Sequence, residues 1–261
     1  MRAGAVAYSA TAGAWQRGPA RIYDRLAEIL ISFFPVRLDG LRVLDVGAGT
    51  GAATRAALTA GAAGVVAVDF AWGMLAHDAR RRPPAALADA LALPFASRSF
   101  DAAVAAFCLN HLSAPAAGLR EMARVTRPGG ALLATAYAAD DTHPVRAAVE
   151  GALTARGWTP EPWYLDLRAE ATPLLATAEG CSAAAGAAGL DAQMVALRVS
   201  FDDLDARALV AWRLGLAQHA PFMAQLSPRD RDALENDALD RLGHGAPRLE
   251  RSILMLRALS P

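Results

Sequence analysis

Short apolar runs alternate with amphipathic helical segments along the first half of the chain. Strand-length runs occur at residues 41–46, 64–69, 99–107 and 131–137, and the segments between them carry apolar residues at helical spacing. Strands that alternate with helices pair in parallel, because each right-handed crossover returns the chain to the same end of the sheet. The pattern therefore predicts an α/β fold with a doubly wound, mostly parallel sheet.

The second half of the chain follows this pattern less closely. An alanine-rich helix is expected at residues 173–189, a sixth strand at 192–201 and a last strand at 249–259. Two segments, 138–172 and 202–245, separate these elements and are interpreted as cap inserts. Pro144, Pro160 and Pro162 are expected to deny regular structure to much of the first insert, and the second should be helical with breaks at Pro221 and Pro228.

A glycine-rich turn follows the first strand. Asp45 ends this strand, and Gly47, Gly49 and Gly51 then alternate with small residues before helix formers resume. Without Cβ atoms the turn allows a ligand to lie against the backbone and to receive N–H groups at the start of the helix. The third glycine comes one residue too early for the dinucleotide fingerprint G-x-G-x-x-G, so a pyrophosphate is not the expected ligand.

Further motifs follow in order. Asp69 ends the second strand, where a carboxylate is placed to accept the hydroxyls of a ribose. Asp89 and Ala90 open a D-A-x-x-L-P-F segment, and residues 124–130 read R-V-T-R-P-G-G before the fifth strand.

Together these motifs resemble the class I S-adenosylmethionine (SAM) methyltransferases, in particular the small-molecule branch that includes the ubiquinone and menaquinone biosynthesis enzymes. The resemblance covers about residues 40–137. It implies a Rossmann-like sheet of seven strands, the last of them antiparallel, and SAM as the cofactor. The cofactor-binding residues it implies are Asp45, Gly47, Gly49, Gly51, Asp69, Phe70, Met74, Asp89, Ala90, Phe107 and Tyr8.

This reading divides the chain into six parts. They are an N-terminal helical lid (1–40), a SAM-binding core (41–137), a first cap insert (138–172), a core helix with the sixth strand (173–201), a second cap insert (202–245) and the last strand (246–261).

Aromatic residues in the lid and the inserts predict the acceptor pocket. The candidates are Trp15, Tyr23, Trp158, Trp163, Tyr164, Trp212, Phe222 and Met223. Such side chains suit an uncharged or aromatic small molecule, for example a secondary metabolite or a quinone-like compound. The alternative is that they only form the core of the cap.

A general base is sought among the histidines. His111 follows the fourth strand at the expected ligand edge, and His143, His219 and Tyr8 are its rivals. Neither a carboxylate pair typical of a Mg²⁺ site nor a Cys/His zinc spacing is evident, so no metal is expected.

Composition narrows the class of protein. Lys plus Arg equals Asp plus Glu at 26 each, and all the basic residues are arginines. This balance argues against nucleic acid as a partner. No apolar run reaches the roughly 18 residues of a membrane span. Cys108 and Cys181 read as free thiols, which favours the cytoplasm, and a monomer or homodimer is expected.

Two alternative functions remain open. One is a SAM-binding protein repurposed for another reaction, such as a cyclisation. The other is a nicotinamide-dependent oxidoreductase, which the glycine spacing and the absence of lysine both disfavour.

Overall fold

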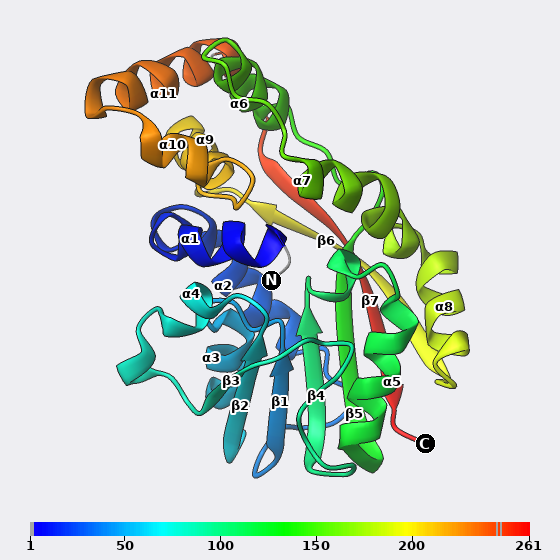
Figure 1. Cartoon of the computed structure of the whole chain (residues 1–261). Helices are drawn as coiled ribbons and strands as arrows, with labels where there is room; N and C mark the ends of the chain where they lie inside the picture. The colour runs from blue at the N-terminus through cyan, green and yellow to red at the C-terminus, as the bar shows by residue number, and fades with distance from the viewer. Residues whose placement is uncertain (1–2, 244, 246) are drawn as a thin grey trace.

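The computed structural model describes residues 3–243, 245 and 247–261. Its centre is a seven-stranded sheet with the order β3-β2-β1-β4-β5-β7-β6 (Figure 1). The strands are β1 (Arg42–Val46), β2 (Gly64–Asp69), β3 (Ala85–Leu87), β4 (Phe100–Ala106), β5 (Thr126–Tyr137), β6 (Ala192–Phe201) and β7 (Leu249–Leu259). Strand β7 is antiparallel to both β5 and β6, and the other pairs are parallel. The predicted fold class is therefore confirmed.

Helices cover both faces of the sheet and its carboxyl edge. They are α1 (Ala3–Arg17), α2 (Pro19–Ile31), α3 (Ala52–Thr59), α4 (Trp72–Ala76), α5 (Pro115–Val125), α6 (Val145–Thr154), α7 (Pro162–Asp166), α8 (Ala178–Ala187), α9 (Ala206–Leu214), α10 (Ala220–Gln225) and α11 (Pro228–Leu242). Short turns of 3-10 or π helix are η1 (Ala79–Arg81), η2 (Leu109–His111), η3 (Leu167–Ala171) and η4 (Thr172–Leu175). No helix in the described ranges is long and apolar enough to cross a membrane.

The side chains of successive strand residues pack into two separate hydrophobic cores. Val43 belongs to the core that contains α2 and α6, whereas its neighbour Leu44 belongs to the core that contains α5 and α8. Side chains alternate between the two faces of a strand, so a sheet covered on both faces needs apolar residues at nearly every position. This requirement explains the continuous apolar runs that predict the strands.

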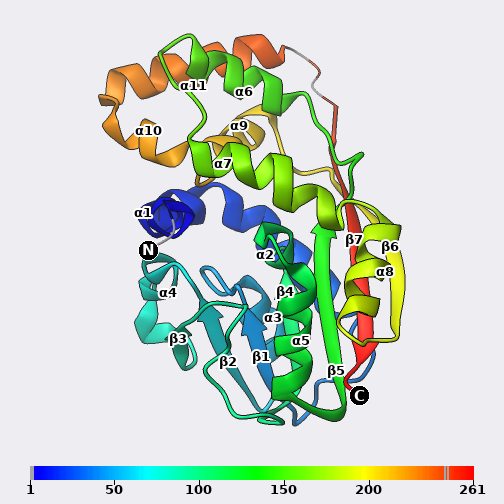
Figure 2. The same ribbon diagram turned by 45° about the vertical axis from the view of Figure 1, so that its right-hand side comes forward.

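The cap lies beyond the carboxyl ends of the parallel strands. Helices α6, α9 and α11 pack together in it, and α1 lies between this group and the sheet edge (Figure 2). The carboxyl edge is thus enclosed by the N-terminal helices on one side and by both inserts on the other.

Pro144 and Pro162 stand at the starts of helices, which corrects the expected loss of regular structure there, whereas Pro160 lies in the non-helical stretch between α6 and α7. Pro162 and Pro228 occupy the first positions of α7 and α11, and Pro144 directly precedes α6. The first turn of a helix has no hydrogen bond for proline to remove, so these positions tolerate it well.

Two boundaries and one short strand differ from the sequence-based prediction. Strand β5 begins at Thr126, because Phe100 pairs with Thr126 before the intervening Pro-Gly-Gly turn bulges out and pairing resumes between Ala102 and Ala131. Helix α8 is shorter than residues 173–189, since a 3-10 turn precedes it. The three-residue β3 gives too short a pattern to detect.

Candidate functional site

Two adjoining cavities occupy the carboxyl edge of the sheet. The larger has a volume of about 690 Å³ and the smaller about 470 Å³. Eight residues line both of them, namely Tyr8, Gly47, Asp69, Phe70, Cys108, His111, Trp163 and Leu167. These residues form the junction between the two cavities, where two bound ligands would contact each other.

The glycine turn after β1 has a backbone that other residues adopt poorly. Gly47 has φ +72° and Gly49 has φ +55°, in the left-handed region where a Cβ is unfavourable. A Cβ at Gly47 would also overlap with the Cys108 side chain. The turn therefore brings bare backbone to the cavity.

Asp45 has one carboxylate oxygen paired and one without a partner. Its Oδ2 accepts a hydrogen bond from Thr54 Oγ1 at 2.5 Å, whereas its buried Oδ1 accepts none from any residue the structure describes. Burial raises the pKa of Asp45 to about 6, and the neighbouring Asp69 acts in the same direction. A buried unpaired oxygen is costly, so this atom is suited to a hydrogen-bond donor on a ligand.

Asp69 lies at the end of β2 with only 7% of its surface exposed. Its Oδ2 accepts from the Gly49 N–H and its Oδ1 from the Ala71 N–H, each at 2.8 Å. Burial raises its pKa, although these two hydrogen bonds oppose the shift. The carboxylate thereby fixes the glycine turn and also lines both cavities.

Arg82, which no sequence motif indicated, holds the glycine turn through hydrogen bonds to backbone carbonyl groups. Its guanidinium donates to the carbonyl oxygens of Gly49 and Leu75, at 3.3 and 2.5 Å. Its positive charge opposes the upward pKa shifts of Asp45 and Asp69.

Most of the other predicted cofactor residues line one of the two cavities. Asp89 and Ala90 line it together with Phe70, and Asp89 Oδ1 accepts from the Leu91 N–H at 3.0 Å. Met74 lines the larger cavity, as does Phe107, which has φ +54° at the end of β4. Gly51 begins α3 with φ +91° but lines neither cavity.

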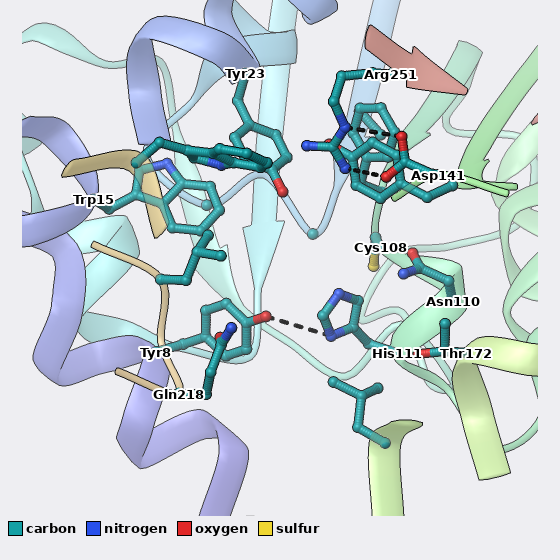
Figure 3. Close-up of a pocket in the computed structure, with 18 of the residues that line it drawn as sticks. Tyr8, Trp15, Tyr23, Cys108, Asn110, His111, Asp141, Thr172, Gln218 and Arg251 are labelled. Carbon is teal, nitrogen blue, oxygen red and sulfur yellow. Dashed lines mark hydrogen bonds and ion pairs between the residues drawn. The ribbon is translucent and has the colours of Figure 1, made fainter. Parts of the chain in front are cut away.

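Tyr8 and His111 face each other at the junction. The Tyr8 hydroxyl lies 3.5 Å from His111 Nδ1 (Figure 3). Burial lowers the pKa of His111 to about 4 and raises that of Tyr8. At neutral pH the imidazole is therefore uncharged and retains a nitrogen that can accept a proton or a hydrogen bond.

Aromatic rings from the N-terminal helices and the strand ends form one wall of the larger cavity. Trp15 packs on Tyr23 with ring centroids 4.7 Å apart, and Phe107 stacks on Tyr137 at 4.3 Å. Trp163 also lines the cavity, with its ring 6.1 Å from that of Tyr8. The structure thus brings the predicted Trp15, Tyr23, Trp163, Tyr164 and Trp212 around one space.

Three predicted pocket residues lie elsewhere. Trp158 is 5% exposed in the core of the cap, and its Nε1 donates to the Gln218 carbonyl at 3.2 Å. Phe222 and Met223 pack against the same core and do not line either cavity. Their positions on the inserts are correct for a pocket, but their side chains hold the helices together.

The pocket is also more charged than its aromatic content suggests. Arg146, Arg213 and Arg251 line the larger cavity together with Asp141 and Glu150. No local sequence pattern indicates this cluster, because its members come from α6, α9, β7 and the loop after β5. The expectation of a pocket for an uncharged molecule therefore requires correction.

The remaining histidines are poorer base candidates. His219 is completely buried, with Nδ1 2.7 Å from the Arg213 carbonyl, and it lines neither cavity. His143 lines the larger cavity, but its Nε2 lies 2.9 Å from the Pro247 carbonyl. Within residues 3–243, 245 and 247–261, no group of three or more His, Cys, Asp or Glu side chains is arranged to hold a metal.

The central part of the chain is similar to a known protein family. Residues 44–134 match the model of a methyltransferase domain family. This stretch is similar to methyltransferase domains. A demethylmenaquinone methyltransferase of Renibacterium salmoninarum is 40% identical over 141 residues, which cover 53% of this chain and 57% of that protein. The chain spans about half the length of the curated relatives it matches.

Solved structures share the fold of this stretch and its surroundings. Phosphoethanolamine N-methyltransferase 2 of Haemonchus contortus superposes with a TM-score of 0.57 at 21% identity, covering 91% of this chain and 52% of its own. The 4+2 cyclase SpnF gives a TM-score of 0.54 at 22% identity, covering 91% and 80%. At these identities the likeness shows the fold alone.

Proposed function

We propose that this protein is a SAM-dependent methyltransferase that methylates a small aromatic or quinone-like acceptor. The observation that carries the proposal is the buried Asp45 Oδ1, which lies unpaired among the described residues beside the glycine turn. An anionic oxygen there suits the α-ammonium group of SAM. The match of residues 44–134 to a methyltransferase model and the similarity to demethylmenaquinone methyltransferases support the same conclusion.

The two cavities divide the binding task. The turn at Gly47 and Gly49, together with Asp45, would hold the amino-acid part of the cofactor. Asp69 would accept the ribose hydroxyls, since each of its oxygens retains lone pairs beyond its backbone hydrogen bond. Asp89 and Ala90 would contact the adenine in the smaller cavity.

The larger cavity would hold the acceptor. Bound SAM supplies a methyl group already activated by its sulfonium, and transfer leaves S-adenosylhomocysteine. The aromatic wall of Trp15, Tyr23 and Trp163 orients the acceptor and excludes water, so positioning provides much of the rate.

His111 would receive the proton that the acceptor loses. It lines both cavities, and its lowered pKa keeps the imidazole neutral and able to accept. Tyr8 contacts His111 Nδ1 and would hold the ring in place. With Nδ1–H donating to the Tyr8 hydroxyl oxygen, Nε2 would be the nitrogen that accepts the proton.

Several expectations about the whole protein belong with this proposal. The equal numbers of acidic and basic residues favour a small-molecule acceptor over nucleic acid. The two free cysteines favour the cytoplasm. A monomer or homodimer stays a prediction, as does the division of the chain into lid, core and cap inserts.

Calorimetry and a methyl-transfer assay test the proposal together. S-adenosylhomocysteine should bind in the micromolar range and NAD much more weakly, because the turn is not built for a pyrophosphate. Asp69→Ala should weaken S-adenosylhomocysteine binding about tenfold or more through loss of charge-assisted hydrogen bonds, whereas the exposed Asp191→Ala should not. Tighter binding of NAD than of S-adenosylhomocysteine would contradict the proposed methyltransferase function.

Transfer of label from methyl-labelled SAM then separates catalysis from binding alone. Labelled product from a panel of phenolic and quinol acceptors would support a methyltransferase. Binding of the cofactor without transfer to any acceptor would favour the repurposed SAM-binding protein instead.

A further inference from the structure

The cap side of the larger cavity carries a cluster of arginines with buried N–H groups, which we define as Arg146, Arg213 and Arg251. Arg251 has a side chain only 7% exposed, and Asp141 holds it through two ion-paired hydrogen bonds of 3.0 and 2.6 Å. Figure 3 shows this pair at the cavity, on the same side as Tyr23 and away from the Tyr8–His111 contact. The arginine cluster is therefore part of the acceptor cavity and separate from the proposed cofactor contacts.

The cluster has more hydrogen-bond donors than the protein itself satisfies. Arg251 Nη1, Arg213 Nε and Nη2, and Arg146 Nη2 are buried and have no hydrogen-bond partner among the residues described. The closest approach is an ion pair of 3.6 Å between Arg213 Nη2 and Glu150 Oε1. Trp212 Nε1, in the same corner, is likewise buried without a partner in the described chain.

The charges of the cluster do not cancel. Three guanidinium groups face two carboxylates, those of Asp141 and Glu150, and three minus two leaves one positive charge. Arg168 and Glu250 also line the cavity, as do Asp45 and Asp69 at the glycine turn, so the positive excess is local to the arginine cluster. Buried guanidinium groups are costly unless they are paired.

The rings around the cluster keep the guanidinium planes fixed. Arg251 Cζ lies 3.8 Å from the centroid of the Tyr137 ring and 4.8 Å from that of Trp212, and Arg213 Cζ lies 5.4 Å from the same Trp212 ring. Stacking of this kind orients the N–H groups before a ligand arrives. A preorganised set of donors loses less entropy on binding than flexible side chains do.

We propose that the arginine cluster binds a carboxylate on the acceptor molecule. The unpaired buried atoms in this corner are N–H groups and the Tyr137 hydroxyl, which can also donate, so a ligand that presents acceptors fits them. A planar carboxylate matches the fork of an arginine. The single excess positive charge suits a monoanion better than a dianionic phosphate. The proposal rests on the proposed function and specifies its acceptor as an aromatic or quinone-like molecule that carries an acidic group.

The test compares three probes with the folded, full-length protein by calorimetry. The probes are 1,4-dihydroxy-2-naphthoate, its neutral carboxamide and the corresponding 2-phosphate, each titrated with S-adenosylhomocysteine present. We expect the carboxylate to bind about tenfold tighter than the amide or more. Equal binding of the carboxylate and the amide, or no binding of either, would overturn the proposal, as would tighter binding of the phosphate.

Variants locate the effect on the cluster. Arg213→Gln and Arg146→Gln should each remove most of the preference for the carboxylate over the amide, while the amide affinity stays within about threefold. Arg207→Gln is the matched control, because Arg207 lies exposed on the same helix as Arg213. An unchanged preference in both cluster variants would also overturn the proposal.

Binding of S-adenosylhomocysteine alone is measured first. Failure of the proposed function would show as no such binding, and the probes would then be titrated without it. Failure of the carboxylate site would show as normal S-adenosylhomocysteine binding without a preference among the probes.

Discussion

The buried polar atoms that lack a hydrogen-bond partner differ between the two ends of the paired cavities. At the glycine turn the buried atoms without a partner among the described residues are Asp45 Oδ1 and Arg82 Nε, with Asn110 Oδ1 nearby on η2, whereas under the cap they are mostly the nitrogens of the arginine cluster and Trp212. The turn thus presents an unpaired carboxylate oxygen to the cavity, and the cap side presents mostly unpaired N–H donors. A cationic group is suited to the first end and an anionic group to the second, so a single cavity system can orient two ligands by charge.

The two ends also differ in how the chain builds them. Asp45, Asp69 and His111 follow three neighbouring parallel strands, and the fold places the ends of such strands at one edge. The arginine cluster instead combines α6, α9 and β7, which are connected through the cap. The cofactor end depends on the sheet, and the acceptor end depends on how the inserts pack.

The largest effect is expected from the glycine turn. Gly49→Val should leave no measurable S-adenosylhomocysteine binding, because the new side chain would enter the cavity at φ +55°. Gly186→Val is the matched control, since a Cβ added at Gly186 meets nothing within 4 Å. Calorimetry checks both variants, and retained binding by Gly49→Val would place the cofactor away from the turn.

A smaller loss is expected at the junction. His111→Ala should lower kcat about 100-fold if the imidazole takes the proton, with S-adenosylhomocysteine affinity within a few-fold. His77→Ala, outside both cavities, should retain activity. Since the pKa of His111 is about 4, protonation of this residue should not reduce kcat of the parent enzyme between pH 8 and pH 5. A loss below about threefold would mean that positioning alone suffices.

A substitution in the aromatic wall of the larger cavity should have a smaller effect. Trp163→Ala should raise the KM for a phenolic acceptor about tenfold through loss of aromatic contact, with little effect on the cofactor KM. Trp158→Phe should leave both KM values unchanged, because Trp158 lies in the core of the cap. Steady-state kinetics distinguishes the two, and equal KM values in both variants would contradict the assigned wall.

The smallest effect is a pH dependence of cofactor affinity. The pKa of Asp45 is raised to about 6, so its carboxylate is mostly protonated at pH 5 and mostly ionised at pH 7. The affinity for S-adenosylhomocysteine, whose ammonium needs the ionised form, should therefore rise by up to about tenfold over this interval. Asp69, whose pKa is also raised, acts in the same direction. Asp45→Asn should flatten the dependence, and an undiminished slope in this variant would exclude Asp45 as its source.

Local patterns explain what could be predicted from the sequence. The strands around Asp45 and Asp69 are continuous apolar runs ended by an acid, and glycine spacing marks the turn between strand and helix. The roles of these residues stay proposals, but their common location at one sheet edge follows from topology alone.

The acceptor end could not be predicted in the same way. Arg251 is one of 26 basic residues, and nothing near it in the sequence indicates that Asp141, 110 residues earlier, will pair with it. Trp158 and Trp163 are equally aromatic and only a short distance apart, yet one lies in the core and the other lines a cavity. Trp158 lies between α6 and α7 and Trp163 lies on α7. Which of the two faces the cavity depends on how these segments pack.

Strand β7 ties the cap to the sheet in a way that should govern how the protein unfolds. It pairs with β6 over its length from Leu249↔Phe201 to Ala258↔Ala192, and with β5 from Ile253 onward. The second insert begins where β6 ends and finishes where β7 starts, so both of its ends are anchored in one ladder. Arg251 in turn joins that ladder to the loop after β5. Opening the cap by itself would break this ladder, so its amide protons and those of the central strands should exchange with solvent in one cooperative event.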